Sequence, residues 1–402
     1  MPGKAAISDV QTLFKCHFGS TPTHVVRAPG SLELLGCHAL CGDGLAISAA
    51  INRFVSIAAT PRRDGKIELV AAGGRESFWL SEIRPNPASS WADGIKSVLG
   101  QLRRRGANLS GFSAAIWDDM PPGIELGRAA AVAVATGLTL RQLYPFSLTE
   151  TGVSAPPRRN AKGQLPGATL RERLCLAKLC QASSERVGLV DPMTSLFGKA
   201  WHVLSIDLRF GTVEPAPMIG VAIVVCFAAV ASGESEGCGR SGGTPGAAEI
   251  RACCDSAAAR LGAKSLRSVE MSLLKASRSK LTVREYECAC FVVGETARVV
   301  GAERALRGDD QRQLGQFMLQ GHDSSREMLK DATPEVDLLV ELARAQPGCL
   351  GARRCGSEGG DATINLVAFH QAEEFRKQMV RRYEIQTREK LQTFVLQMTD
   401  AG

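Results

Sequence analysis

The chain has 402 residues, of which 45% are hydrophobic and 22% are charged, and its mean hydropathy is -0.02. This balance excludes a disordered or fibrous protein, and at roughly 100–200 residues per domain the length predicts about two domains. The net charge of +7 favours small anionic ligands, but the basic residues are scattered and aromatic residues make up only 5%, which excludes a stacking surface for nucleic acid.

Residue periodicity predicts strands early in the chain and mainly helices later. The predicted strands are 23–27, 54–60, 67–72, 220–231 and 363–369. The predicted helices are 91–105, 128–144, 171–185, 283–306, 310–329, 334–345 and 371–383. Two segments rich in Gly, Pro, Ser or Arg, 152–168 and 232–247, are expected to be surface loops. This order of elements indicates an α+β fold.

The sequence also indicates where the protein resides. The longest apolar run, 220–231, is too short to span a membrane, and the N-terminal MPGKAAISDV lacks the apolar core of a signal peptide. Thirteen cysteines without paired C-x-x-C spacing are typical of reduced thiols, and Cys37, His38 and Cys41 lack the second ligand pair of a zinc site. We therefore expect a cytoplasmic protein with no membrane or nucleic-acid partner and no metal site formed by these residues.

The first motif runs from Arg27 to Gly44 and contains Arg-Ala-Pro-Gly, Leu-Gly-Cys-His and Gly-Asp-Gly. It resembles the signature of the galactokinase branch of the GHMP small-molecule kinases, in which a strand and a glycine turn present polar groups to a sugar. The resemblance implies a sugar contact for His38. Ser31 stands where the family has its catalytic arginine, and Cys37 and Leu40 stand where it has a sugar-binding glutamate and aspartate.

The second motif is the segment 121–131, PPGIELGRAAA, which leads into a helix rich in Ala and Val. It resembles the family's phosphate loop, where glycines let backbone N–H groups approach phosphates at a helix N-terminus. The resemblance implies nucleotide contacts by four residues: Gly123, Leu126, Gly127 and Arg128. Glu125 places a carboxylate that opposes phosphate, and the serines of the family loop, one of which helps to hold Mg²⁺, are replaced. Arg128 is either a phosphate ligand or a surface arginine at a helix start.

The third motif is the segment 186–198, RVGLVDPMTSLFG. It resembles the family segment that carries the catalytic aspartate, which implies that Asp191 is the acid/base and that Gly188 adjoins the substrate. An aspartate in this position accepts the proton of a sugar hydroxyl during phosphoryl transfer. The alternative for Asp191 is a helix cap. Glu185 is the carboxylate nearest to the place of the family's magnesium-binding glutamate.

The fourth motif is the segment 351–363, GARRCGSEGGDAT, which resembles the glycine-rich turn that braces the family's active site. Four matched segments in the family order identify the chain as a member of the galactokinase branch. The resemblance implies a two-domain GHMP-kinase-like fold, divided into 1–217 and 218–402, with the active site in the cleft between the domains.

The same resemblance implies ATP and Mg²⁺ as cofactors and a sugar as the phosphoryl acceptor, and it does not indicate an oligomeric state. Because the galactose-binding positions are largely replaced, two hypotheses remain open. The chain is a sugar kinase with weak or no turnover of galactose, or it is a catalytically silent pseudokinase that acts as a ligand-binding or regulatory protein.

Overall fold

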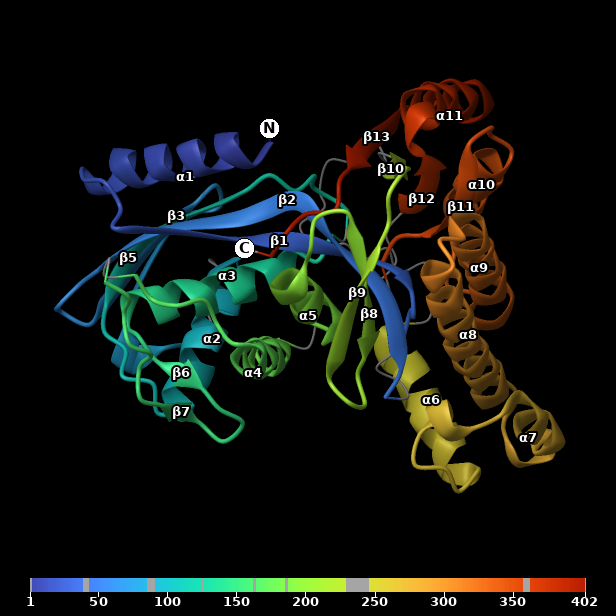
Figure 1. The fold of residues 1–402 in the computed structure, drawn as a ribbon, viewed down its shortest axis with the longest axis horizontal. Coiled ribbons are helices and arrows are strands. Elements are labelled where there is room, and N and C mark those ends of the chain that lie inside the picture. The colour runs from blue at the N-terminus through green and yellow to red at the C-terminus, as the bar shows by residue number, and fades with distance from the viewer. Residues whose placement is uncertain are drawn as a thin grey trace.

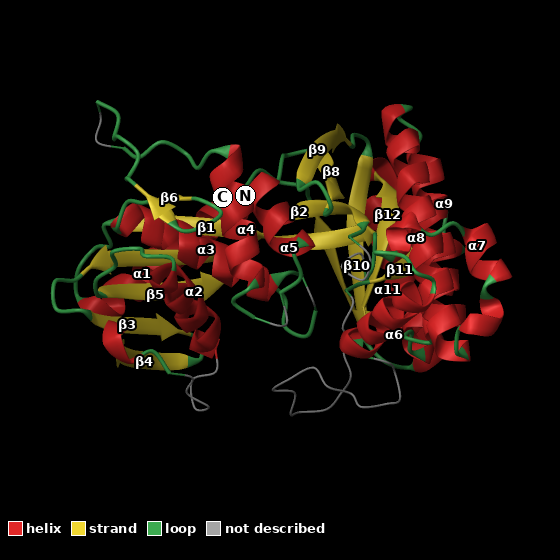
Figure 2. Cartoon of the chain, turned by 90° about the horizontal axis from the view of Figure 1, so that it is seen from below, coloured by secondary structure: helices red, strands yellow, loops and turns green. Residues whose placement is uncertain are grey.

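Two β-sheets, each covered by helices, make up the molecule (Figure 1). The computed structural model describes residues 2–38, 43–84, 91–124, 126–161, 164–184, 187–228, 246–356 and 362–401. The sheets lie side by side, and the long pair of strands β1 and β2 runs from one part of the molecule to the other (Figures 1 and 2). The α+β architecture expected from the sequence is thereby confirmed.

The first sheet has the strand order β4-β3-β5-β2-β8-β9, and β1 pairs with β2 outside this path. All its pairs are antiparallel except β3 with β5. Its strands are β1 His24–Leu35, β2 Leu45–Pro61, β3 Lys66–Ala71, β4 Gly74–Trp79, β5 Phe112–Asp118, β8 His202–Asp207 and β9 Thr212–Pro217. A short separate hairpin consists of β6 Ser147–Leu148 and β7 Val153–Ser154.

Helices cover both faces of the first sheet. Neighbouring residues of a strand point to opposite faces, so each strand contributes side chains to both layers. Ala58 of β2 packs with Val10 and Phe14 of α1, whereas Ile57 and Ala59 belong to the large core on the other face. That core is completed by α2 Asp93–Arg104, α3 Arg128–Leu143, α4 Leu170–Gln181 and α5 Val190–Phe197, while α1 spans Pro2–Phe18. Strand β2 is buried on both faces over most of its length, and most of its residues are accordingly apolar.

The second sheet is antiparallel, with the order β11-β12-β10-β13. Its strands are β10 Val221–Ala228, β11 Cys349–Arg354, β12 Ala362–Ala368 and β13 Leu391–Leu396. The accompanying helices are α6 Ala247–Arg260, α7 Met271–Ala276, α8 Val283–Arg307, α9 Gln311–Ser324, α10 Pro334–Arg344 and α11 Ala372–Thr387. None of the helices in the described ranges is long and apolar enough to cross a membrane.

The chain passes from the first sheet to the second between β9 and β10, and its C-terminal end then returns to the first. Met398 forms a β-bridge with Ile51, and the amide of Ala401 donates to the carbonyl of Gly198 at 2.8 Å. The division into domains 1–217 and 218–402 stays a prediction, because contacts such as these join residues on both sides of it.

The predicted elements are present, with ends that differ by several residues. Capping boxes explain two of the helix starts: Thr169 with Glu172 begins α4, and Thr282 with Glu285 begins α8. Helix α4 ends at Gln181, four residues before the predicted end, and α1, which was not predicted, is held by an apolar stripe that includes Val10 and Phe14. Most of the expected loop 232–247 lies outside the described residues.

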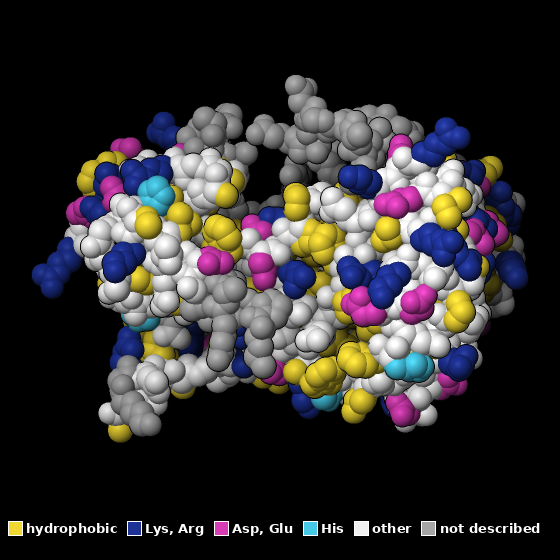
Figure 3. All heavy atoms as spheres, turned by 90° about the horizontal axis from the view of Figure 1, so that it is seen from above, with side chains coloured by type: hydrophobic (Ala, Val, Ile, Leu, Met, Phe, Trp, Pro, Cys, Tyr) yellow, Lys and Arg dark blue, Asp and Glu magenta, His cyan; other side chains and the backbone are white. Residues whose placement is uncertain are grey.

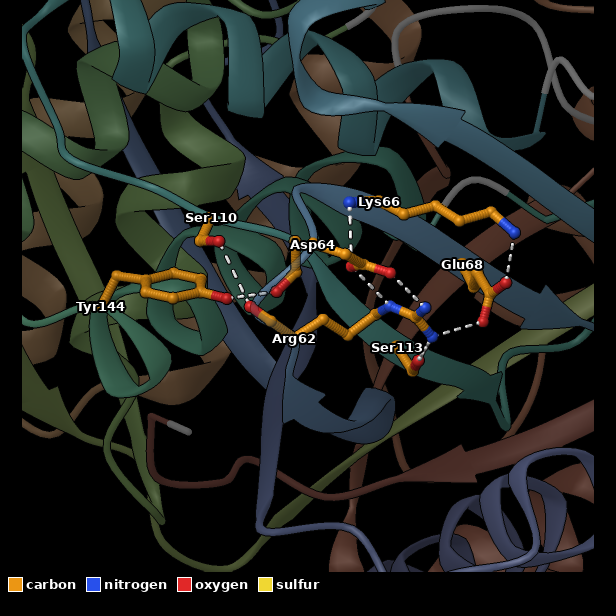
Figure 4. A network of polar contacts seen from close by, with 8 residues as sticks. Arg62, Asp64, Lys66, Glu68, Ser110, Ser113 and Tyr144 are labelled. Carbon is orange, nitrogen blue, oxygen red and sulfur yellow. Dashed lines mark hydrogen bonds and ion pairs between the residues drawn. The ribbon is translucent and has the colours of Figure 1, made fainter.

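A polar network holds the turn between β2 and β3 against β5 (Figure 4). The guanidinium of Arg62 donates to Asp64 at 2.6 Å and 3.0 Å and to Glu68 at 2.8 Å, and Lys66 donates to the other oxygen of Glu68 at 2.7 Å. Hydrogen bonding to Arg62 lowers the pKa of the Asp64 carboxyl to about 2. On the face shown in Figure 3, basic and acidic side chains are interspersed, so neither sign dominates that surface.

Candidate active site

Asp191 lies in the first turn of α5 and is oriented by a serine from β1. The hydroxyl of Ser31 donates to Asp191 Oδ1 at 2.7 Å. Two further bonds fix the helix to the first sheet: Ser195 Oγ donates to the carbonyl of Pro29 at 2.8 Å, and the hydroxyls of Ser48 and Thr194 lie 2.6 Å apart. The carboxylate is therefore held by elements whose own positions are fixed, which is what a reacting group requires.

The glycine-rich turn before α3 meets Asp191 at the same serine. The amide of Ser31 donates to the carbonyl of Leu126 at 2.9 Å. Gly127, the N-cap of α3, has φ +67°, and a Cβ there would lie 2.0 Å from Ser31 Oγ. A serine in place of Gly127 would thus be strained in backbone and in space. The small residues Ser31 and Gly127 fit one another, and the two motifs form one site.

Arg128 braces this turn from within. Its guanidinium donates to the carboxylate of Asp118 at 2.5 Å, and to the carbonyls of Met120 and Pro121 at 2.8 Å and 3.2 Å. The side chain remains 37% exposed. Several of its five N–H groups are used inside the turn, so the arginine can meet a phosphate only with its remaining donors.

The start of helix α3 fits a phosphate group, whereas its first residues offer nothing to a magnesium ion. Helix α3 has no side-chain cap and no acidic residue in its first turn, so its N-terminal N–H groups are available to an anion. Gly123 has φ +78°, and a Cβ there would lie 3.0 Å from the ring of Phe227 in β10. The side chains of Gly127, Arg128 and Ala129 offer no oxygen ligand for magnesium.

Glu33 is a site residue that sequence reasoning missed. It lies two positions after Ser31 on β1, hence on the same face of the strand, and it is the only residue of 28–35 that is not fully buried. Its Oε1 is buried without a hydrogen-bond partner among the described residues. Burial, and then the nearby charge of Asp191, raise the pKa of Glu33 to about 8. A charged residue inside an apolar strand, in phase with Ser31, was the available signal.

A protonated Glu33 predicts a distinctive dependence of stability on pH. Between its unfolded pKa, near 4.5, and its folded pKa, near 8, the folded state binds a proton that the unfolded state has released. The free energy of unfolding therefore falls as pH rises through this window. Glu33→Gln should remove this fall and be more stable than the parent chain at pH 8, as thermal melts at several pH values would show. A parallel fall in both proteins would contradict a protonated Glu33.

The end of the first motif is tied to the second sheet and its helices. The amide of Gly36 and the guanidinium of Arg353 both donate to Glu295 Oε1 at 2.9 Å. Cys37 packs into an apolar cluster formed with α6 and α8, where it presents no carboxylate to a ligand. Cys37, the position at which the resemblance implies a sugar-binding glutamate, thus lies in a hydrophobic core.

His38 is buried beside Asp331 and has a left-handed φ of +62°. Its Nε2 lies 3.8 Å from Asp331 Oδ2, and its ring meets that of Phe291 edge to face. Burial alone would raise the pKa of Asp331, but the bond to His38 and the charge of Arg354 outweigh it and lower the pKa to about 2. The contact of His38 with a sugar stays a prediction, since these contacts also suit a structural histidine.

The remaining predicted positions fall into two groups. Gly188 is half-buried, three residues before Asp191, and Arg353 and Arg354 of the fourth motif bind the buried carboxylates Glu295 and Asp331. Arg353 of the fourth motif is thereby joined through Glu295 to the end of the first motif, while the role of the fourth motif in bracing the active site stays a prediction. Other residues singled out in the sequence lie outside the described residues, namely Leu40, Cys41, Glu125, Glu185 and the stretch 357–361.

Comparison with known proteins places this chain in a family. Residues 12–61 match the model of the galactokinase galactose-binding signature. A galactokinase of Chloroflexus aurantiacus is 31% identical, with 97% of this chain and 95% of that protein covered. The chain belongs to the galactokinase family. The signature that defines the match includes β1, on which Ser31 and Glu33 lie.

Solved structures agree on the fold of this galactokinase-family chain. Lactococcus lactis galactokinase, solved with galactose, matches with a TM-score of 0.83 at 22% identity, with 98% of each chain covered. A mevalonate kinase of L. major, solved with R-mevalonate, matches with a TM-score of 0.60 at 18% identity, covering 95% of this chain and 100% of the other. The fold is that of the GHMP kinases.

Proposed function

We propose that this chain is an ATP-dependent sugar kinase of the galactokinase type whose preferred acceptor is not galactose. One observation carries the proposal. The hydroxyl of Ser31 donates to Asp191 at 2.7 Å, and the amide of Ser31 donates to Leu126 in the glycine-rich turn that would hold phosphate. A proton acceptor and a phosphate-binding turn thus adjoin one another, as transfer of a phosphoryl group to a hydroxyl requires. Bound ATP would supply that phosphoryl group.

Asp191 is proposed to accept the proton of the attacking hydroxyl. Its Oδ1 accepts a hydrogen bond from the Ser31 hydroxyl, which fixes the orientation of the carboxylate. The serine hydroxyl orients but adds no positive charge, whereas the arginine that the family has at this position would neutralise charge in the transition state. We therefore expect slower turnover than in relatives that keep the arginine. Arg128, with the donors that the turn leaves over, is the cation proposed to lie nearest the phosphates.

The acceptor is proposed to be a sugar with another arrangement of hydroxyls. Cys37 is enclosed in an apolar cluster, so the carboxylate that reads a hydroxyl in the family is lost. Glu33 brings a carboxyl group to the same strand face as Ser31, and in its protonated form it both donates and accepts a hydrogen bond. Sites that hydrogen-bond a substrate hydroxyl discriminate strongly against sugars that place it elsewhere.

The site is proposed to lie between the two sheets, as the resemblance implied. Its glycine-rich turn comes from the first sheet and packs at Gly123 on Phe227 of the second, and the end of β1 is bound by Glu295 of α8. Acceptor and nucleotide would then meet residues from both parts of the chain. Gly188, next to α5, is proposed to adjoin the acceptor.

A pseudokinase is the second candidate, and the phosphate turn favours it. Arg128 is engaged by Asp118 and two carbonyls, and the first residues of α3 carry no oxygen ligand for magnesium. In this case the chain would bind a sugar or nucleotide without turnover, as a ligand-binding or regulatory protein.

Measuring ADP release from Mg-ATP with a panel of aldoses and polyols separates the two candidates. The kinase proposal predicts release with at least one member, and a kcat/KM for galactose lower by about 10²-fold or more, because the hydroxyl-binding carboxylate at Cys37 is missing. Thermal shifts on the same ligands report binding independently of turnover. Shifts with no ADP release from any member would establish the pseudokinase. Rapid turnover of galactose would overturn the proposed acceptor.

A further inference from the structure

A cavity with basic walls lies beside the proposed active site, and Asp191 is not among the residues that line it. Its volume is about 370 Å³, within the usual range for small-molecule sites, and β1, α3, α4, α5 and the loop before α4 contribute to its lining. Three arginines from three different elements line it: Arg27 of β1, Arg141 of α3 and Arg173 of α4. None of the three arginines lies in the segment 121–131, the motif for which the resemblance implies nucleotide contacts.

Arg141 is the most unusual of the three, because it is only 5% exposed and incompletely bonded. Its Nη1 donates to the carbonyl of Pro166 at 3.0 Å. Its Nε and Nη2 are buried without a hydrogen-bond partner in the described ranges, and the nearest carboxylate oxygen, Glu172 Oε1, is 3.5 Å from Nη2. The other oxygen of Glu172 is engaged by the Thr169 cap at 2.8 Å. Burying N–H donors without hydrogen-bond acceptors costs free energy, so this site favours a ligand that supplies an acceptor.

The other two arginines are held in place by contacts that use only some of their N–H donors or none of them. Arg173 donates to the carbonyls of Ala168 and Leu196, both at 3.1 Å. The guanidinium of Arg27 stacks on the ring of Phe54, 4.4 Å from the ring centroid, and donates no hydrogen bond to any of the described residues. The residues that line the cavity thus include three arginines and no carboxylate, and Glu172 lies beside Arg141 outside the lining, so these four side chains together carry two surplus positive charges.

We propose that this cavity binds a small phosphate-bearing anion of the sugar-monophosphate class. Arginine forks match the geometry of phosphate oxygens, and two surplus charges balance a phosphate monoester dianion. Leu138 and Leu196 provide an apolar wall for the carbon skeleton, and Gln142 provides a donor and an acceptor for hydroxyls. The volume admits one such molecule.

The cavity adjoins the elements that position the proposed active site. Arg27 precedes Ser31 by four residues on β1, and Leu196 follows Asp191 by five residues on α5. An anion that binds there contacts the strand that carries Ser31 and the helix that carries Asp191. The proposal goes beyond the kinase function and holds equally for a chain that transfers no phosphate.

Isothermal titration of the full chain with glucose 6-phosphate, inorganic phosphate and glucose tests the proposal. Glucose 6-phosphate should bind with one site per chain, and glucose alone should not. Arg27→Gln should raise the Kd about tenfold or more. Gly167→Phe should do the same by filling the cavity without removing charge, because a Cβ at Gly167 meets no atom within 4 Å. Arg381→Gln, an exposed arginine on α11, is the matched control and should leave the Kd unchanged.

The remaining outcomes are also decisive. Equal affinity for inorganic phosphate and glucose 6-phosphate, both weakened by Arg27→Gln, would assign the site to free phosphate and retain the phosphate chemistry. Affinity that survives Arg27→Gln and Gly167→Phe but is lost in Arg128→Gln would place the anion in the proposed active site and overturn the proposal. Absence of binding by both phosphate compounds would overturn it as well.

Discussion

Asp191→Asn should lower kcat for the accepted sugar by about 10²–10⁴-fold, the usual contribution of a positioned acid/base. The asparagine preserves the size of the side chain and can still accept the hydrogen bond from Ser31, which is 2.7 Å from Asp191 Oδ1 in the parent chain. It cannot take a proton at neutral pH, so the chemical step is lost while the site keeps its shape. The measurement is ADP release under single-turnover conditions.

Two variants make this result specific. Asp255→Asn, at an exposed position of α6, removes the same charge away from the site and should leave kcat unchanged. Ser31→Ala keeps the carboxylate but removes its orienting hydroxyl, so it should lower kcat by a smaller factor than Asp191→Asn. Turnover that persists in Asp191→Asn would show that another group accepts the proton.

Glu295→Gln should destabilise the fold by about 3–5 kcal/mol, the cost of leaving a buried charge without its partner. Both Glu295 and Arg353 are buried, with Glu295 Oε1 and Arg353 Nη1 2.9 Å apart, and Arg298 donates to the other carboxylate oxygen at 2.7 Å. Burial alone would raise the pKa of Glu295, but the charges of Arg353 and Arg298 lower it to about 2. Urea unfolding at neutral pH measures the effect.

The matched control is Glu373→Gln, which breaks an exposed ion pair with Arg376 at 3.2 Å and should cost less than about 1 kcal/mol. The double variant Glu295→Met with Arg353→Met should be more stable than Glu295→Gln, because the more deeply buried charge of Arg353 is then removed together with its partner and only Arg298 loses an ion pair. Since the folded pKa is depressed, the contribution of Glu295 is present above its unfolded pKa and is lost as pH falls toward 2. A cost for Glu295→Gln no larger than the control would contradict a tightly coupled pair.

Local patterns were sufficient for the elements and for the order of the motifs. Period-two and helical spacing of apolar residues located β1, β2 and most of the helices, since these signals depend only on neighbours in the chain. Helix ends were harder to predict than helix interiors: α4 ends at Gln181, with Ala182 as its C-cap, whereas the predicted helix extended to residue 185. The family resemblance rests on residue identities in four segments and needed no coordinates.

Contacts between distant segments were decided by the tertiary structure alone. The bond from Ser31 to Asp191 joins residues that are 160 positions apart. Glu33, two positions after Ser31 on the same strand, is brought to the site with it, although the neighbours of Glu33 in the sequence are apolar. Arg128 was open to two interpretations in the sequence, and packing against Asp118 supplied its partner. No spacing rule links such pairs, because their distances depend on how strands and helices pack rather than on their separation along the chain.

The sequence by itself therefore determined the fold class, the family and the presence of Asp191 in a motif that begins a helix. Only the tertiary structure decided that Cys37 is enclosed in a hydrophobic core, and that Arg27, Arg141 and Arg173 line one cavity. The physical reason is the range of the interactions. Secondary structure follows from periodicities of two and 3.6 residues, whereas a site is formed by side chains whose burial and charges depend on all the elements packed around them.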